Sequence, residues 1–245
     1  MAALLHSARN STVPMRRIAH LSDLHFGRIA PGLLAPLREC VRRLEPHLVV
    51  VSGDLTAAAG AGQFRDARAF LDTLPGPQVV VPGSADIAPR GLFRLKATLG
   101  PYRRFVSEDV EPEYADDVVA VIGVNSAASP ANDNGGDEDA RRARARIHGL
   151  DARVVKIVAT SRPLLDSGAD IVLTGSRHEP RDRGPDTPLV VQSGTAPAGS
   201  SRAGVLSLHS LVIEGANITV ERWSWNGHTR RFEAQGRETY GLPRS

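Results

Sequence analysis

The chain of 245 residues has few of the residues that build disulfide frameworks or thiolate metal sites. Its one cysteine, Cys40, excludes an internal disulfide and a metal site made of several cysteines. A single cysteine favours a reducing compartment, and we therefore expect a cytoplasmic protein. No apolar run approaches about 18 residues, so we expect no membrane-spanning helix.

Lysine is almost absent as well, because only Lys96 and Lys156 occur and arginine supplies the remaining positive charge. The net charge is only +3, which suits a small anionic ligand such as a phosphate compound. This charge gives no support to specific nucleic-acid binding. A protein partner cannot be named from the composition.

The length is ample for one large domain with a sizeable core. Residues 1–14 contain an apolar patch too short for a signal peptide, so we interpret them as a flexible extension, with Met15 as an alternative start. We assign 15–233 to a single domain and 234–245 to a C-terminal tail.

Short apolar runs alternate with amphipathic stretches in the first third of the chain. Three runs predict strands: 16–22, 47–53 and 78–83. The stretches 33–44 and 63–74 between them carry apolar residues at helical spacing and predict helices. This β-α-β-α-β order predicts parallel strands with helices packed on the sheet.

Strand patterns dominate the rest of the chain. We expect short helices at 91–100 and 140–150, a polar loop at 129–139, and strands at 118–124, 156–160, 170–175, 189–196, 205–215 and 217–227. The last three strands follow one another with almost no helix between them, which predicts an antiparallel C-terminal third. The order fits an α/β domain with one mixed sheet or two packed sheets.

Chemically useful side chains fall where the predicted strands end. Asp23 and His25 follow the first strand, Asp54 follows the second, and His178 follows the strand at 170–175. Open α/β sheets bind ligands at the carboxyl ends of their strands, and carboxylates with imidazoles suit Zn, Mn or Fe. Each residue taken alone also fits a structural role, as a helix cap, a turn residue or a solvated loop histidine.

The motifs "IAHLSDLHFG", "LVVVSGDLT" and "VVVPGSADIAP" resemble the opening of the calcineurin-like metallophosphoesterases, and "KIVATSRPLL", "ADIVLTGSRHEP" and "LVVQSGTA" extend the resemblance. The resemblance covers most of 16–227 and implies a four-layer αββα sandwich of two mixed sheets flanked by helices. It also implies a two-metal site for phosphoric ester hydrolysis at the strand ends.

The chain departs from the family pattern at several metal and phosphate positions. Ser84 and Ala85 occupy the places of the Asn and His in Gly-Asn-His-Asp, and Asp86 keeps the last residue. Ser161 and Arg162 replace a His-His pair, and Ser176 replaces the first His of Gly-His-x-His. The family acid position is thus Ala85, so we assign no catalytic residue.

These departures fall on one half of the site. The resemblance assigns Asp23, His25, Asp54 and His178 to one metal, and all four are present. The second metal keeps only the shared Asp54, so the resemblance implies one divalent ion, Mn, Fe or Zn, and no second ion.

Two arginines, Arg162 and Arg177, stand beside the lost histidines. Because a guanidinium matches phosphate oxygens, the pair could hold a phosphate without cleaving it. The alternative is that both are ordinary residues of an arginine-rich chain.

Three functions remain open at this point. The first is a phosphate-binding or regulatory pseudoenzyme with weak or no hydrolysis, favoured by the substituted positions. The second is an active single-metal phosphoesterase or phosphodiesterase, favoured by the intact half-site. The third is a purely structural role.

Overall fold

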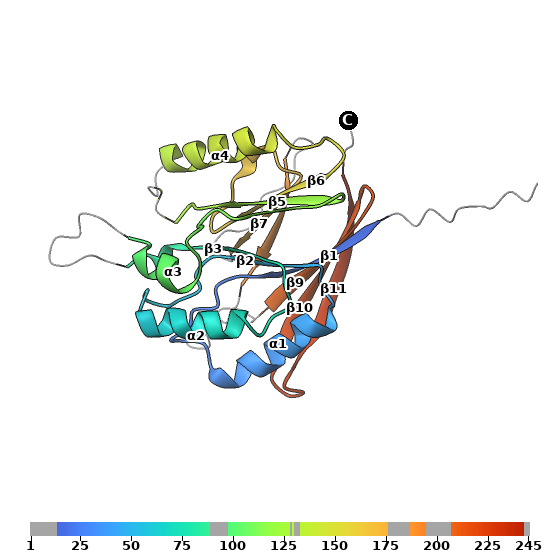
Figure 1. The fold of residues 1–245 in the computed structure, drawn as a ribbon. Coiled ribbons are helices and arrows are strands. Elements are labelled where there is room, and N and C mark those ends of the chain that lie inside the picture. Colours follow the sequence, from blue (N-terminus) through green and yellow to red (C-terminus); the bar gives the residue numbers. More distant parts are fainter. Residues whose placement is uncertain are drawn as a thin grey trace, which may run out of the picture.

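The computed structural model describes residues 14–88, 98–127, 129, 133–175, 187–194 and 207–242, with the side chains of 133–135 excepted. These residues form two mixed β-sheets packed face to face, with helices on both outer faces (Figure 1). The four-layer αββα arrangement expected from the resemblance is therefore confirmed. None of the helices in the described residues is both long and apolar enough to cross a lipid bilayer.

The first sheet has six strands in the order β11-β10-β9-β1-β2-β3. Their bounds are β1 (Met15–Leu21), β2 (Leu48–Ser52), β3 (Gln78–Val81), β9 (Ser207–Glu214), β10 (Asn217–Asn226) and β11 (Arg231–Gly241). Strands β1, β2 and β3 are parallel, as the β-α-β-α-β pattern predicts. Strands β9 and β10 are antiparallel, as predicted for 205–215 and 217–227, and β11, which was not predicted, pairs antiparallel with β10.

The second sheet has five strands in the order β4-β5-β6-β7-β8. Their bounds are β4 (Glu113–Ala115), β5 (Val119–Val124), β6 (Val155–Thr160), β7 (Ile171–Gly175) and β8 (Leu189–Ser193). Strands β5 to β8 are parallel, and β4 pairs antiparallel with β5.

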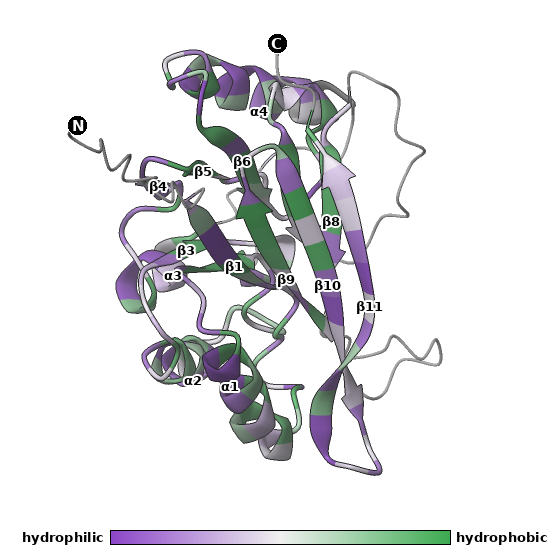
Figure 2. Cartoon of the chain, turned by 90° about the vertical axis from the view of Figure 1, so that its right-hand side faces the viewer, coloured by the Kyte–Doolittle hydropathy of each residue, from purple (hydrophilic) through white to green (hydrophobic). Residues whose placement is uncertain are grey.

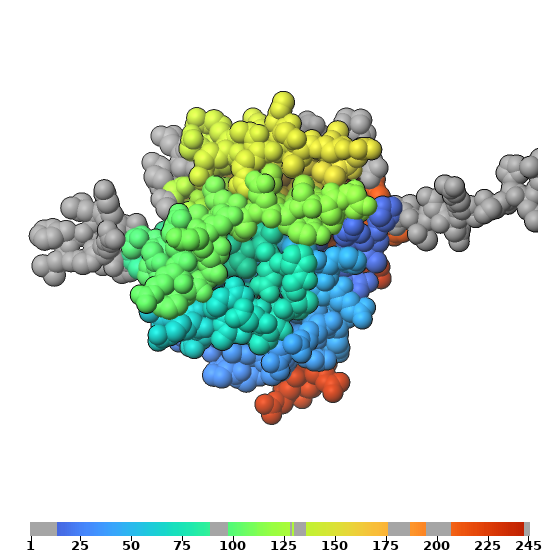
Figure 3. Space-filling model, in the orientation of Figure 1, coloured from blue at the N-terminus to red at the C-terminus, as the bar shows by residue number. Residues whose placement is uncertain are grey.

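Helices cover the outer face of each sheet. Three helices pack on the side of the first sheet: α1 (Leu34–Arg43), α2 (Ala61–Leu71) and α3 (Gly100–Phe105). Helix α4 (Asp133–Ile147) packs on the second sheet. Short 3₁₀ turns occur at Pro31–Leu33, Ser84–Asp86 and Leu165–Ser167. The space-filling view shows α1 and α2 on one side and α4 on the other, with the segment that includes β4 exposed between them (Figure 3).

Apolar side chains fill the three spaces between the layers. The core between the sheets includes Ile18, Val50, Ile157 and Leu173, all fully or almost fully buried. Because parallel strands buried on both faces require continuous apolar runs, segments such as 48–51 read as uninterrupted Leu and Val. This rigid double sheet fixes the ends of β1, β2, β3 and β6, from which the candidate site is built.

Several predicted elements differ from the structure. Strand β8, which we placed in the antiparallel third, instead extends the parallel ladder of β7. Helix α4 begins at Asp133, inside the predicted polar loop, and is therefore longer at its start than the predicted helix at 140–150. The C-terminal tail predicted at 234–245 is wrong for residues 234–241, because these residues belong to β11 and lie along β10. The predicted extension before residue 14 and most of the predicted helix at 91–100 lie outside the described residues.

Candidate metal centre

Three of the four predicted ligands come together at the ends of β1 and β2. These two strands are parallel neighbours, so the loops that follow them meet at one edge of the sheet. One ligand atom each from Asp23, His25 and Asp54 lies within 4.8 Å of the others, and all three residues are buried. His178, the fourth predicted ligand, lies outside the described residues.

The backbone holds all three residues in an unusual conformation. Asp23, His25 and Asp54 have φ angles of 54°, 44° and 52°, in the left-handed region. Residues other than glycine adopt this region at a cost of about 1–3 kcal/mol each, and such strain gathers at functional sites. The loops compensate by pairing, because the N–H groups of Asp23 and His25 donate to the carbonyl oxygens of Gly53 and Asp54.

The imidazole of His25 presents one nitrogen to the two carboxylates. Its Nδ1 lies 3.3 Å from the carbonyl oxygen of Thr56, a contact that requires the proton on Nδ1. Its Nε2 then faces Asp23 Oδ1 at 3.6 Å and Asp54 Oδ2 at 3.8 Å. The carboxylate of Asp23, with a contribution from Asp54, raises the pKa of His25 against the opposing effect of burial.

This donor set fits a divalent cation. An unprotonated Nε2 beside two carboxylate oxygens brings three lone pairs together, which is unfavourable unless a proton or a metal ion lies between them. The carbonyl of Thr56 supplies the outer hydrogen bond that metal-binding histidines usually make. Carboxylate and imidazole are ordinary ligands of Zn, Mn and Fe.

The shared carboxylate, Asp54, is held on its other side by the turn after β3. Its Oδ1 accepts a hydrogen bond from the N–H of Ala85 at 2.9 Å. Gly83 makes this approach possible, since a Cβ there would lie 2.2 Å from both the N and the Oδ1 of Asp54. Gly175 likewise borders Asp23, where a Cβ would lie 2.7 Å from Oδ2.

Asp86, which keeps the last residue of the Gly-Asn-His-Asp pattern, holds two loops of the site together. Its buried carboxylate accepts hydrogen bonds from the backbone of Gly83, Leu55 and Thr56 and from the Thr56 hydroxyl. Burial raises the pKa of Asp86 to about 6, although these hydrogen bonds oppose the shift. Asp86 therefore fastens the turn after β3 to the loop after β2.

A cavity of about 480 Å³ opens beside Asp23 and Asp54, two of the three candidate ligands. It is lined by Ser22, Asp23, Ser52, Asp54, Ser84, Ala127, Ser129, Ser161, Arg162 and Gly175. The substituted positions Ser84 and Ser161 thus border the same space as these two carboxylates. Hydroxyl groups predominate among its polar lining, and Ser161 is hydrogen-bonded to Ser126 at 2.8 Å.

The predicted phosphate-binding residue Arg162 lines this cavity but also supports its wall. Its guanidinium donates to the carbonyl oxygens of Ser126 and Ser129, at 2.5 and 2.6 Å. Ser126 and Ser129 were not among the predicted site residues. Their position just after the predicted strand at 118–124 could have indicated them, because the other site residues also follow strand ends. Ser176 and Arg177 lie outside the described residues.

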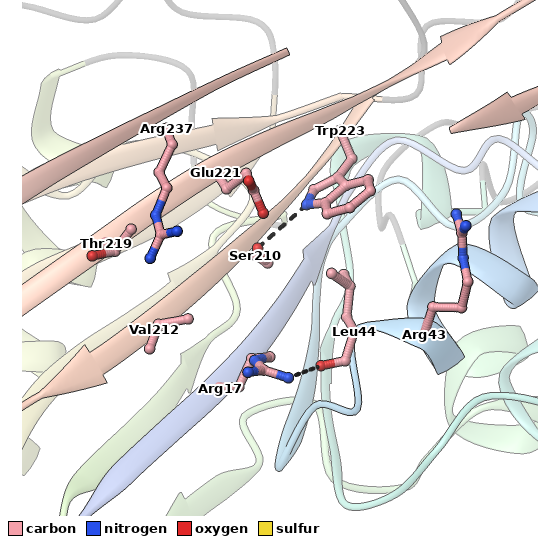
Figure 4. A pocket seen from close by; sticks show the side chains of 9 residues that line it. All are labelled: Arg17, Arg43, Leu44, Ser210, Val212, Thr219, Glu221, Trp223 and Arg237. Carbon is pink, nitrogen blue, oxygen red and sulfur yellow. Dashed lines mark hydrogen bonds between the residues drawn. The ribbon is translucent and has the colours of Figure 1, made fainter. Parts of the chain in front are cut away.

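A second groove, of about 390 Å³, lies on the outer face of β9, β10 and β11 beside the end of α1 (Figure 4). Arg17, Arg43 and Arg237 line it together with a single carboxylate, Glu221. Arg17 and Arg43 donate to the carbonyl oxygens of Leu44 and Phe232. The groove shares no residue with the ligand trio, so we treat it as separate from the candidate metal centre.

A family model described as Calcineurin-like phosphoesterase matches residues 16–196. The chain belongs to this family. Members of the family bind divalent metals, in agreement with the trio of Asp23, His25 and Asp54. No curated protein matches the chain.

Solved structures share the fold at low sequence identity. Vps29 from Chaetomium thermophilum has a TM-score of 0.55 and 11% identity, with 93% of this chain and 98% of that chain covered. Vacuolar Protein Sorting 29 from Cryptosporidium parvum has a TM-score of 0.54 and 12% identity, with 93% and 98% covered.

The purple acid phosphatase PPD1 from yellow lupin (Lupinus luteus) seeds has a TM-score of 0.64 and 12% identity. The match covers 93% of this chain but only 54% of the phosphatase, so the chain spans about half its length. At these identities the similarity establishes the fold alone.

Proposed function

We propose that the chain is a phosphate-ligand-binding pseudoenzyme of the calcineurin-like phosphoesterase family that holds one metal ion and hydrolyses phosphoesters weakly or not at all. The observation that carries this proposal is the asymmetry of the site. Asp23, His25 and Asp54 converge, whereas the adjoining cavity offers Ser84 and Ser161 where the family has metal ligands.

The substituted side chains support the loss of the second ion. The carboxylate of Asp54 keeps lone pairs for a second metal even with Oδ2 facing His25 and Oδ1 accepting the N–H of Ala85. The loss therefore depends on the other ligands of that ion. Serine hydroxyls at 84 and 161 are much weaker metal ligands than the amide and imidazole groups that they replace.

In the proposed site Asp23, His25 and Asp54, with His178 as the fourth ligand, would hold Mn, Fe or Zn. A bound ion of this kind polarises phosphoryl oxygens and lowers the pKa of bound water. Arg162 would place positive charge beside the cavity, with Arg177 assisting. Ala85 carries no proton to donate to a leaving group, and loss of a positioned acid costs about 10²–10⁴ in rate.

The alternative is an active single-metal phosphoesterase or phosphodiesterase, which the intact ligand trio favours. The two proposals differ in one measurement, the Mn²⁺-dependent hydrolysis of an aryl phosphodiester. Hydrolysis that is lost in Asp54→Asn supports the enzyme, because that carboxylate is central to the metal centre. Absence of hydrolysis together with binding of inorganic phosphate supports the pseudoenzyme.

Phosphate binding is tested by calorimetry on the Mn²⁺-loaded chain. We expect the double variant Arg162→Ala, Arg177→Ala to weaken the affinity for phosphate. Arg153→Ala is the matched control, because Arg153 is an exposed arginine paired with Asp151. Unchanged affinity in the double variant would contradict the assigned role of the two arginines.

The single cysteine extends the proposal to location. Cys40 is buried in α1, and burial raises the pKa of its thiol to about 11. A lone, unreactive thiol needs no oxidising environment, and we propose a cytoplasmic protein. Detection of the tagged chain in fractionated cells tests this.

A further inference from the structure

The six-stranded sheet extends beyond the five-stranded sheet on one side. Strand β8, the last strand of the smaller sheet, packs near β9, while β10 and β11 continue past it. Figure 2 shows β8, β10 and β11 on this side of the molecule. A groove of about 510 Å³ follows, with one side formed by residues of β8 and the floor by residues of β9, β10 and β11.

Within the described ranges, the side of this groove is a β-strand edge that has no strand partner along Val190 and Gln192. The N–H of Leu189 donates to Asp170 at the start of β7, so alternate β8 residues from Leu189 onward point their backbone groups toward β7. Val190 and Gln192 then point theirs toward the groove. The carbonyl of Gly194, two residues further along, accepts the N–H of Ser207 on this same side, which agrees with that alternation.

We propose that this groove binds an extended peptide segment of a partner protein, which adds to the free edge of β8 as a further strand. The main-chain groups of Val190 and Gln192 recur at the two-residue repeat of a strand, and another extended main chain matches that repeat along its whole length. The contact between Gly194 and Ser207 shows that this edge already accepts a strand partner at one end.

The floor selects the chemistry of the peptide. Cross-strand pairing places His209 beside Arg222 and Val220 beside Glu238, so one cation and one anion flank an uncharged centre. Burial, with a contribution from Arg222, lowers the pKa of His209 to about 4, which keeps it neutral at pH 7. A charged side chain placed at the centre would be desolvated without a partner.

The segment therefore carries uncharged side chains toward the floor. Val191 of β8 and Val220 of β10 line the same groove and face the space between the sheets, so apolar side chains suit these positions. β-Branched residues fit this surface, because they favour the extended conformation and pack well on a pleated surface.

The test is a selection of random peptides on phage against the full chain, followed by fluorescence anisotropy with the enriched peptide. We expect Val190→Pro to weaken its affinity by about tenfold or more, because proline removes an N–H on the groove side. The fold tolerates this change, since the N–H of Val190 does not pair with β7 and proline is accepted at such edge positions. Val190→Thr keeps the N–H and the branched shape and should leave the affinity unchanged.

A second measurement removes any dependence on the folding of the proline variant. Two forms of the peptide are made, N-methylated at odd-numbered or at even-numbered residues. Methyl groups on the N–H groups that face β8 should abolish binding, and methyl groups on those that face away should preserve it. Equal binding of both methylated forms, equal affinity for the proline variant, or no enriched peptide would overturn the proposal. A dimer of this chain that dissociates in Val190→Pro would overturn it too, by assigning the edge to a second copy.

Discussion

Replacement of Asp54 by asparagine should have opposite effects on stability with and without metal. The carboxylate oxygens that Asp54 and Asp23 contribute to the trio lie within 4.8 Å of each other. At an effective dielectric constant of about 20, two unit charges at that distance repel by about 3 kcal/mol. The carboxylate of Asp23 raises the pKa of His25, and a proton on the imidazole would offset part of this repulsion. We therefore expect Asp54→Asn to raise the free energy of unfolding by about 1–3 kcal/mol in excess EDTA.

Asparagine preserves the remaining contacts of the position. Its carbonyl oxygen can accept the N–H of Ala85, and its amide can donate to the Nε2 of His25. With Mn²⁺ at about 1,000 times its Kd the order should reverse, because a ligand at that concentration stabilises the metal-binding protein by about 4.1 kcal/mol. Urea unfolding followed by circular dichroism measures both conditions.

The comparison refutes the reasoning if the variant is less stable than the original chain in EDTA. That result would mean that Asp54 is retained for structural hydrogen bonds. Asp66→Asn, on the exposed face of α2, is a matched control and should change neither condition.

Three further changes test the scaffold of the site. Gly83→Ala places a Cβ 2.2 Å from Asp54 N and should cost about 1–3 kcal/mol and abolish metal binding, as measured by urea unfolding and metal analysis. Thr56→Val removes the 2.8 Å hydrogen bond to the Asp86 carboxylate and should cost about 1.5–3 kcal/mol in the same unfolding assay. Burial opposes a low pKa for Asp116, but hydrogen bonds lower it to about 2, so stability should fall as the pH drops from about 4 toward 2.

Each of these changes has a control within the chain. Gly32→Ala meets no atom within 4 Å and should change stability little. Thr56→Ser keeps the hydroxyl and should recover most of the loss. Arg16→Ala removes the main hydrogen-bond donor to Asp116, so this variant should lose part of its acid dependence. An unchanged acid profile in Arg16→Ala would contradict the assigned cause.

Much of the fold was predictable because parallel strands are buried on both faces. Continuous apolar runs such as 48–51 mark these strands, and helices α1 and α2 lie close to their predicted ranges. Strand β11 could not be predicted in the same way, because it lies at the edge of a sheet and most of its side chains are exposed. An exposed strand has no apolar alternation to reveal it.

The convergence of the ligand trio was also predictable, whereas its surroundings were not. Asp23 and Asp54 follow adjacent parallel strands, and parallel strands end at one edge. The hydrogen bond from Ala85 to Asp54 depends on a backbone N–H, which residue types do not reveal. The unpaired main-chain groups of Val190 and Gln192 depend on which strand edge remains open, and sequence periodicity carries no information about that.

Metal content per chain tests the central claim most directly. The chain is loaded with Mn²⁺ or Zn²⁺, desalted, and measured by elemental mass spectrometry beside Asp54→Asn and His178→Ala. We predict one ion per chain, lost or strongly reduced in both variants. Two ions per chain would contradict the loss of the second half-site, and no ion would contradict the function proposed for Asp23, His25 and Asp54.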